Sequence, residues 1–135
     1  MLFRSVLYCG ENDLANGAEP EAVLLELQRF YHMLRACFPG TPLAYISVKP
    51  SPSREQLMPQ IRETNHVISA YLNLLPNSEF IDIYTPMLGA DGRPRMELFR
   101  GDRLHMTDEG YRLWHSVIAS HLPGANPPPA PAGLP

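Results

Sequence analysis

Residues 43–48, Leu-Ala-Tyr-Ile-Ser-Val, decide the fold, because they form a short run that is apolar at nearly every position. A strand that is covered on both faces has this pattern, and such strands are usually parallel. These six residues therefore predict a buried strand of a parallel sheet.

Two further short strands are expected on either side of this run in the sequence. Residues 2–9 (LFRSVLYC) are rich in β-branched and aromatic types and stop at Gly10, and residues 80–84 (FIDIY) form another apolar run. Helical segments separate the strands, so the order strand–helix repeats three times. This alternation implies parallel strands joined by right-handed crossovers, which is an α/β fold.

The helices are predicted from apolar residues that recur at spacings of three and four. They span residues 20–38 and 55–75, and a third runs from the N-cap Thr107 to about residue 122. The amide of Asn65 lies within the apolar stripe of the second helix, and we interpret it as a satisfied core amide that ties down a loop. The expected buried positions are Val23, Leu27, Phe30, Leu34, Phe38, Met58, Ile61, Ile68, Leu72, Leu75, Tyr111, Trp114, Val117 and Ile118.

Length and composition exclude several classes of protein. The chain has 135 residues, enough for one domain, and a net charge of −3, which leaves no electrostatic footprint for nucleic acid. No apolar run approaches the ~18 residues that a membrane span needs, and two cysteines exclude a disulfide scaffold. Residues 123–135 are rich in proline, alanine and glycine, and are expected to form a disordered tail.

Chemistry in an open parallel sheet collects at the carboxyl ends of the strands. Three loops of this sequence meet that condition. They contain Gly10-Glu11-Asn12-Asp13, the segment 49–54 (KPSPSR), and the long loop 85–105 that ends in Asp102-Arg103-Leu104-His105.

Asp102 and His105 have the spacing of an acid/base pair. A carboxylate three residues before a histidine can accept the Nδ1 proton, fix the tautomer and stabilise the imidazolium that forms when Nε2 takes a proton. The alternative is an aspartate that caps a turn beside a surface histidine. A metal site is not favoured, because His115 and His121 are six residues apart on one helix and do not share a face.

Asn12 has the position of an oxyanion donor. Gly10 allows a sharp turn at the strand end, and an amide just after it can reach over the sheet edge to stabilise a developing negative charge. The alternative is an Asx-turn, which Asn and Asp form readily.

The two motifs together, in this order, resemble the SGNH hydrolases, also called the GDSL esterase/lipase family. The Gly-x-Asn-Asp block of that family matches residues 10–13 and its Asp-x-x-His block matches residues 102–105. The segment 49–54 and the sequence His-Met-Thr-x-x-Gly-Tyr at 105–111 also agree. The resemblance implies that residues 1–122 are the C-terminal portion of a flavodoxin-like, three-layer α/β domain.

The resemblance also implies a function, which is the hydrolysis of carboxylic esters by a serine nucleophile. It assigns His105 as the general base, Asp102 as its partner and Asn12 as an oxyanion donor, with Gly10 and Asp13 helping to form the site. No cofactor and no metal is expected. The implied substrate is a small acyl ester or a lysophospholipid-like molecule.

One block of the family does not occur in these 135 residues, namely the Gly-Asp-Ser that carries the nucleophile. It belongs to the first strand of the family fold, and two β-α units of roughly 60 residues in total would precede Gly10. We therefore expect a truncated gene product, or a missing part supplied by another chain. Ser51 and Ser53 match a loop of the family in which the serines are not the nucleophile.

Two other functions remain open at this point. The first is a catalytically inactive fragment or interaction module, which associates with itself through the uncovered edge of strand 2–9. The second is an unrelated ligand-binding α/β domain, in which Asn12 and His105 would not converge.

Overall fold

The computed structural model describes residues 4–121. In this range the chain forms a parallel sheet of three strands, in the order β1-β2-β3. The strands are β1 Ser5–Leu7, β2 Leu43–Ile46 and β3 Ser78–Ile81. Ala44 lies at the centre of the register, opposite Val6 on one side and Glu79 on the other.

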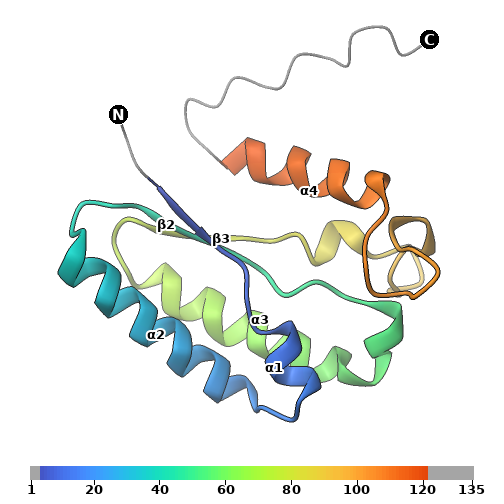
Figure 1. Cartoon of the computed structure of the whole chain (residues 1–135), viewed down its shortest axis with the longest axis horizontal. Helices are drawn as coiled ribbons and strands as arrows, with labels where there is room; N and C mark the ends of the chain where they lie inside the picture. Colours follow the sequence, from blue (N-terminus) through green and yellow to red (C-terminus); the bar gives the residue numbers. More distant parts are fainter. Residues whose placement is uncertain (1–3, 122–135) are drawn as a thin grey trace, which may run out of the picture.

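Helices cover both faces of the sheet, so the domain has three layers (Figure 1). One face carries α1 Glu11–Ala15, α2 Pro20–Cys37 and α3 Met58–Asn73, and the other carries α4 Asp108–His121. Three short 3-10 helices lie in the connections: η1 Pro52–Leu57, η2 Thr85–Met87 and η3 Met96–Leu98. The predicted α/β, flavodoxin-like arrangement is confirmed.

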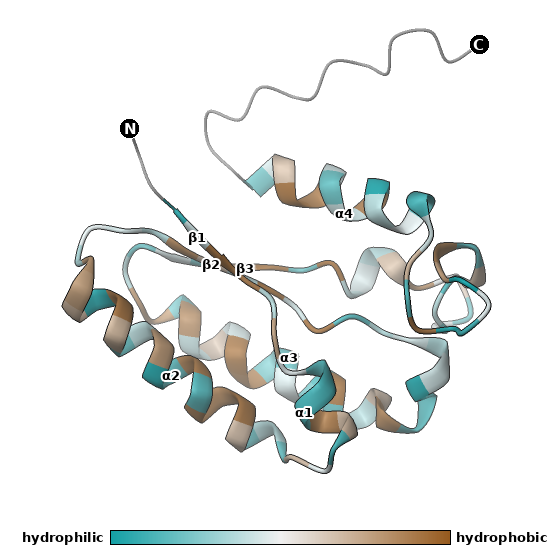
Figure 2. Cartoon of the chain, in the orientation of Figure 1, coloured by the Kyte–Doolittle hydropathy of each residue, from teal (hydrophilic) through white to brown (hydrophobic). Residues whose placement is uncertain are grey.

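The strand β2 is buried at all four positions and contributes to two separate cores. Leu43 and Tyr45 pack with α2 and α3, whereas Ala44 and Ile46 pack on the side of α4. Successive side chains of a strand point to opposite faces, so an all-apolar strand is what two covered faces require. Hydrophobic and hydrophilic residues alternate along α2 and α3 (Figure 2), and the buried apolar residues of both helices pack with Leu43 and Tyr45.

The first long helix follows its predicted pattern except at its end. Pro20 occupies the first turn, where a missing N–H costs nothing, and Val23, Leu27 and Leu34 are buried. Phe38 was predicted to be buried but is 63% exposed. The helix ends at Cys37, and the backbone of Phe38 leaves the helical conformation, so its side chain leaves the buried stripe.

The second long helix begins later than predicted. Residues 52–57 form η1, in which the backbone of Arg54 is not helical, and the regular helix starts at Met58. Asn65 accepts a hydrogen bond from the backbone N–H of Val48 at 2.8 Å and donates one to the carbonyl of Val48 at 3.0 Å. The interpretation of Asn65 as an amide that ties down a loop is confirmed.

The third strand lies two residues earlier than predicted. It runs from Ser78 to Ile81 instead of over 80–84, because the chain leaves the ladder after Ile81. The N–H groups of Ile83 and Tyr84 then donate to the hydroxyl of Ser47. A serine side chain at the end of β2 therefore replaces the ladder partners that a longer strand would have used.

The last helix begins as predicted, because the Thr107 hydroxyl accepts a hydrogen bond from the N–H of Gly110 at 3.3 Å. Its packing differs from the prediction, because Tyr111 is 53% exposed and Trp114, Val117 and Ile118 are only partly buried against the core. Gly110 lets the helix approach the preceding loop closely, since a Cβ there would lie 2.6 Å from the Leu98 carbonyl oxygen. The proposed tail at 123–135 lies outside the described residues.

Candidate active site

The strands are parallel, so their carboxyl ends meet at one edge of the sheet, and the three candidate loops all start there. After β1 the chain turns at Gly10, whose φ is 113°. A Cβ at this position would lie 2.9 Å from Val23 Cγ1, so the turn requires glycine. The residues that follow were predicted to be a loop, but residues 11–15 form the short helix α1, which carries Asn12.

Asp102 and His105 form a closed pair. Asp102 Oδ2 lies 2.6 Å from His105 Nδ1, and Asp102 Oδ1 accepts hydrogen bonds from the backbone N–H groups of Leu104 and His105, each at 2.9 Å. The turn passes through Arg103, which has a φ of 58°. The carboxylate thus caps a turn and holds an imidazole at once, so the two interpretations of this motif are compatible.

These hydrogen bonds change the acidity of Asp102. The contact with His105 and the two backbone N–H groups hold the pKa of this carboxyl well below its ordinary value of 3.8. Asp102 therefore stays ionised wherever His105 can act as a base. The side chain of Asp102 is 49% exposed and that of His105 is 69% exposed, so the pair is open to solvent and accessible to a substrate.

A titration of Asp102 checks this arrangement. Because its pKa is lower in the folded than in the unfolded chain, the ionised carboxylate contributes stability above about pH 3.9. That contribution is lost as the pH falls through the lowered folded value. Carboxyl-carbon NMR of the folded chain should show a midpoint well below that of the urea-unfolded chain, and His105→Ala should raise it. Equal midpoints in the two states would contradict the hydrogen-bonded pair.

Asn12 is exposed on α1, and its side chain is held from one end. Its Oδ1 accepts a hydrogen bond from Arg54 Nη2 at 3.1 Å. Within residues 4–121, Nδ2 of Asn12 makes no side-chain hydrogen bond, so both of its N–H groups are free to donate. Asp13, the neighbouring motif residue, is also exposed, and its backbone carbonyl accepts a hydrogen bond from Ala18 at 2.9 Å.

The loop after β2 connects the other two loops. Arg54 reaches Asn12 on α1, and the backbone N–H of Ser53 donates to the carbonyl of Arg103 at 3.0 Å. Two adjacent residues of one loop therefore contact both motifs. This connection brings the motifs to neighbouring positions on the carboxyl edge.

Beneath these loops lies a buried ionic cluster that the sequence analysis missed. Lys49 Nζ lies 2.6 and 2.8 Å from the two carboxylate oxygens of Glu11, and 2.8 Å from the Ser51 hydroxyl. Ser51 donates to Glu11 at 2.6 Å, and all three residues are buried. Burial lowers the pKa of Lys49, and the Glu11 carboxylate opposes this shift. The signal in the sequence was the only lysine of the chain, placed directly after the buried strand.

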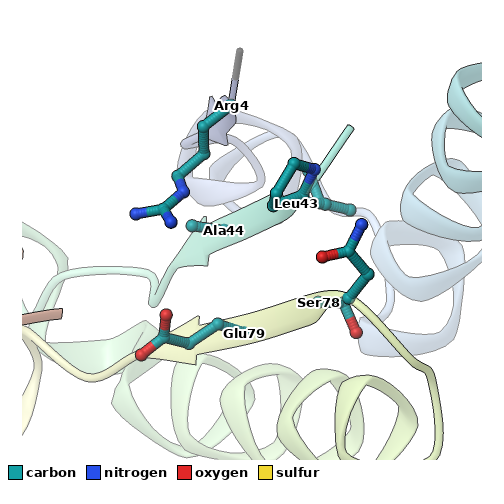
Figure 3. Close-up of a pocket in the computed structure, with 7 residues that line it drawn as sticks. Arg4, Leu43, Ala44, Ser78 and Glu79 are labelled. Carbon is teal, nitrogen blue, oxygen red and sulfur yellow. The ribbon is translucent and has the colours of Figure 1, made fainter. Parts of the chain in front are cut away.

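A separate small cavity lies at the opposite end of the sheet (Figure 3). Its lining includes Arg4 ahead of β1, and Leu43 and Ser78 at the starts of β2 and β3. Its volume of about 200 Å³ is below the roughly 300 Å³ at which ligand pockets begin. It is far from the carboxyl edge in the topology and does not belong to the candidate site.

No group of three or more His, Cys, Asp or Glu side chains in the described range is arranged to hold a metal ion. His121 instead contacts Glu79 on β3 through its Nδ1, at 2.5 Å. Between residues 4 and 121, no helix is both long and apolar enough to cross a membrane.

The fold and the site define a parallel α/β domain with a histidine–carboxylate pair and an exposed amide at the carboxyl edge of its sheet. The sequence model of the GDSL-like lipase/acylhydrolase family matches residues 5–113. The chain belongs to this family. A search of curated proteins gave no match.

Solved structures have the same fold at low sequence identity. A protein of Streptococcus pneumonia described as a platelet activating factor is 17% identical, with a TM-score of 0.77, and the match covers 87% of this chain and 59% of that one. A GDSL-like lipase of Bacteroides thetaiotaomicron is 22% identical, with a TM-score of 0.73 and coverages of 87% and 60%. A carbohydrate esterase family 3 protein of Talaromyces cellulolyticus is 15% identical, with a TM-score of 0.70 and coverages of 86% and 55%. The chain thus spans less than two thirds of the length of these structures.

Proposed function

We propose that this chain carries the acid/base and oxyanion half of an ester hydrolase active site. The observation that carries the proposal is the contact of 2.6 Å between Asp102 Oδ2 and His105 Nδ1. The same sheet edge presents the free amide of Asn12. A base held by a carboxylate and a neutral donor beside it are the two parts that acyl transfer needs in addition to a nucleophile.

In the proposed reaction, Nε2 of His105 takes the proton from a serine hydroxyl as that oxygen attacks the ester carbonyl. Asp102 keeps the proton of the imidazole on Nδ1 and stabilises the imidazolium. Nδ2 of Asn12 donates to the oxygen that becomes negative. His105 then gives its proton to the leaving alcohol, and a water molecule repeats the sequence on the acyl-enzyme.

The nucleophile of this reaction is not expected among the 135 residues. Ser51 lies at the correct edge, but it is fully buried and its hydroxyl donates to Glu11. We therefore propose that the serine comes from a Gly-Asp-Ser segment, as the resemblance to the family implies.

A fluorophosphonate probe tests the assignment of the nucleophile. Removing the serine of a triad costs on the order of 10⁶ in kcat, so the 135-residue chain alone should form no covalent adduct. Intact-protein mass spectrometry after overnight incubation measures the adduct, with a known serine esterase as the positive control. Stoichiometric labelling of any serine of this chain would overturn the assignment.

The test of the function itself uses a polypeptide in which a Gly-Asp-Ser segment precedes this chain, read from the coding sequence upstream of Met1 or transferred from a member of the family. That protein is expected to hydrolyse short acyl esters such as p-nitrophenyl acetate. Lysophospholipid is the second substrate to assay. The matching structures are described as a lipase and as a carbohydrate esterase, so acetylated sugars complete the panel. The proposal is refuted if this polypeptide hydrolyses none of these esters.

A second function, self-association, is favoured by the exposed edge of the sheet. In the strand order β1 is at the edge, and its Val6 is 46% exposed. Beside β1, an apolar groove is lined by Phe30 and Met33 of α2 and by Phe38, which follows the helix. An open strand edge beside apolar side chains is a surface on which a second copy can pair.

Light scattering coupled to size exclusion checks this expectation. The 135-residue chain should elute as a dimer or larger species at high concentration, and Val6→Lys should shift it to the monomer. Leu25→Lys is the matched control, because Leu25 is equally exposed at 46% but lies on α2 and not on the edge strand. A wild-type chain that stays monomeric at millimolar concentration would refute self-association.

A further inference from the structure

We infer that Arg54 is a positioning residue for the proposed oxyanion donor: its guanidinium fixes which end of the Asn12 amide faces the substrate. This inference rests on the proposed function of Asn12. It concerns a residue of the loop after β2, 42 positions along the chain from the amide that it contacts.

The first step is the chemistry of the contact. A guanidinium carries only N–H donors and no acceptor, whereas a side-chain amide has an acceptor oxygen at one end and a donor nitrogen at the other. The contact between Arg54 Nη2 and Asn12 at 3.1 Å can therefore be a hydrogen bond only when Oδ1 faces the arginine. The flipped amide would oppose donor to donor. Nδ2 is thus directed away from Arg54, and remains available for an oxyanion.

The second step is the support of the guanidinium. Its Nη1 lies 3.5 Å from Glu11 Oε1, and its side chain is only 17% exposed. Nη1 itself is buried and makes no hydrogen bond in the described part of the chain. The two nitrogens of one planar group thus face two consecutive residues of α1, Glu11 and Asn12. A planar fork suits such a double contact, which a single ammonium would not reproduce.

The third step is the anchoring of the carboxylate that Arg54 faces. Glu11 is held by Lys49 and Ser51, both buried and both on the same loop segment as Arg54. α1 is therefore joined to the segment 49–54 by three of its side chains. The neighbouring Ser53 binds the carbonyl of Arg103, next to Asp102. One loop consequently sets the position of the amide relative to the histidine–carboxylate pair.

Side-chain NMR of the 135-residue chain tests the orientation without any catalysis. The Nδ2 resonances of Asn12 are assigned by their loss in Asn12→Asp. In the wild-type chain we expect an order parameter for this group close to the rigid value of about 0.85. Arg54→Gln should lower it below about 0.6, to the level of the exposed Asn16. Asn65, held at both ends by Val48, should stay rigid throughout and reports that the chain is folded.

Arg54→Lys is a second variant, which keeps the positive charge beside Glu11 and is therefore expected to fold even if Arg54→Gln does not. The ammonium is drawn to the carboxylate, so the order of Asn12 should fall in this variant too. Arg29→Met is the matched control, because Arg29 forms an exposed ion pair with Glu26 on α2 and should change nothing. The inference is overturned if Asn12 is as mobile as Asn16 in the wild type. It is equally overturned if Asn12 stays rigid in either folded Arg54 variant.

Kinetics separate this inference from the proposed function. In the polypeptide that carries Gly-Asp-Ser, Asn12→Ala should lower kcat by about 10²- to 10³-fold. Arg54→Gln should lower kcat by about 10- to 100-fold with little change in KM, and the double variant should be no slower than Asn12→Ala alone. If Asn12→Ala leaves kcat unchanged, the proposed oxyanion role of Asn12 is wrong, whereas the NMR result on its orientation remains valid. If the losses in kcat of the two single variants multiply in the double variant, Arg54 does not act through Asn12, and the inference is refuted.

Discussion

Lys49→Met is expected to lower the free energy of unfolding by about 3 to 5 kcal/mol. Lys49 donates to both carboxylate oxygens of Glu11 in a buried site, with side-chain exposures of 8% and 10%. Without the ammonium, the carboxylate remains buried with the Ser51 hydroxyl, and with the Arg54 guanidinium at 3.5 Å. A buried charge that has lost its main partner is among the most destabilising changes a single substitution can make.

Urea unfolding, followed by tryptophan fluorescence and circular dichroism, measures this loss. A domain of this size has a total stability of about 5–15 kcal/mol, so the variant should lose at least about a fifth of it and unfold at a clearly lower urea concentration. Arg29→Met removes an exposed ion pair and should cost less than about 1 kcal/mol. The double variant Glu11→Leu, Lys49→Met should recover most of the loss, because a buried ion pair can be replaced by apolar residues. If Lys49→Met alone cost less than about 1 kcal/mol, the cluster would not stabilise the fold.

His105→Ala is expected to abolish ester hydrolysis in the polypeptide that carries Gly-Asp-Ser, with a loss on the order of 10⁶ in kcat. Without the imidazole, no group at this edge takes the proton of the attacking hydroxyl. Asp102→Asn should cost less, about 10⁴, because the base remains while its tautomer and orientation are no longer held. The structure that motivates the comparison is the contact of 2.6 Å between Asp102 and His105 Nδ1.

The measurement is kcat and KM for p-nitrophenyl acetate, with each variant shown to be folded by circular dichroism. His66→Ala is the matched control, because His66 is an exposed histidine on α3 that belongs to neither motif, and it should retain full activity. A His105→Ala variant that keeps more than a hundredth of the wild-type rate would remove this histidine from the general-base role. An Asp102→Asn variant that keeps the wild-type kcat would remove the hydrogen-bond role of the carboxylate.

The sequence pattern predicted the layers of the fold, because the apolar residues of a buried helix face or strand recur at regular spacings along the chain. The apolar run at 43–48 became β2, whose side chains alternate between two cores. The stripe of α3 was buried at the predicted positions Met58, Ile61, Ile68 and Leu72. The ends of the strands were harder to predict. Residues 83 and 84 were expected to belong to the third strand, but their N–H groups donate to the Ser47 hydroxyl, and β3 ends before them. The spacing of apolar residues along a segment does not reveal a hydrogen bond to a residue that is distant in the sequence.

The sequence by itself determined the motifs whose members are close along the chain. Asp102 and His105 are three residues apart, and a turn of that length brings their side chains into contact almost wherever the loop lies. Only the tertiary structure decided the contacts between motifs. Glu11 meets Lys49 and Asn12 meets Arg54 at separations of 38 and 42 residues. Both pairs form because parallel strands bring their carboxyl ends to one edge of the sheet. Glu11 and Lys49 also pair because a charge buried beneath that edge is stable only beside an opposite charge.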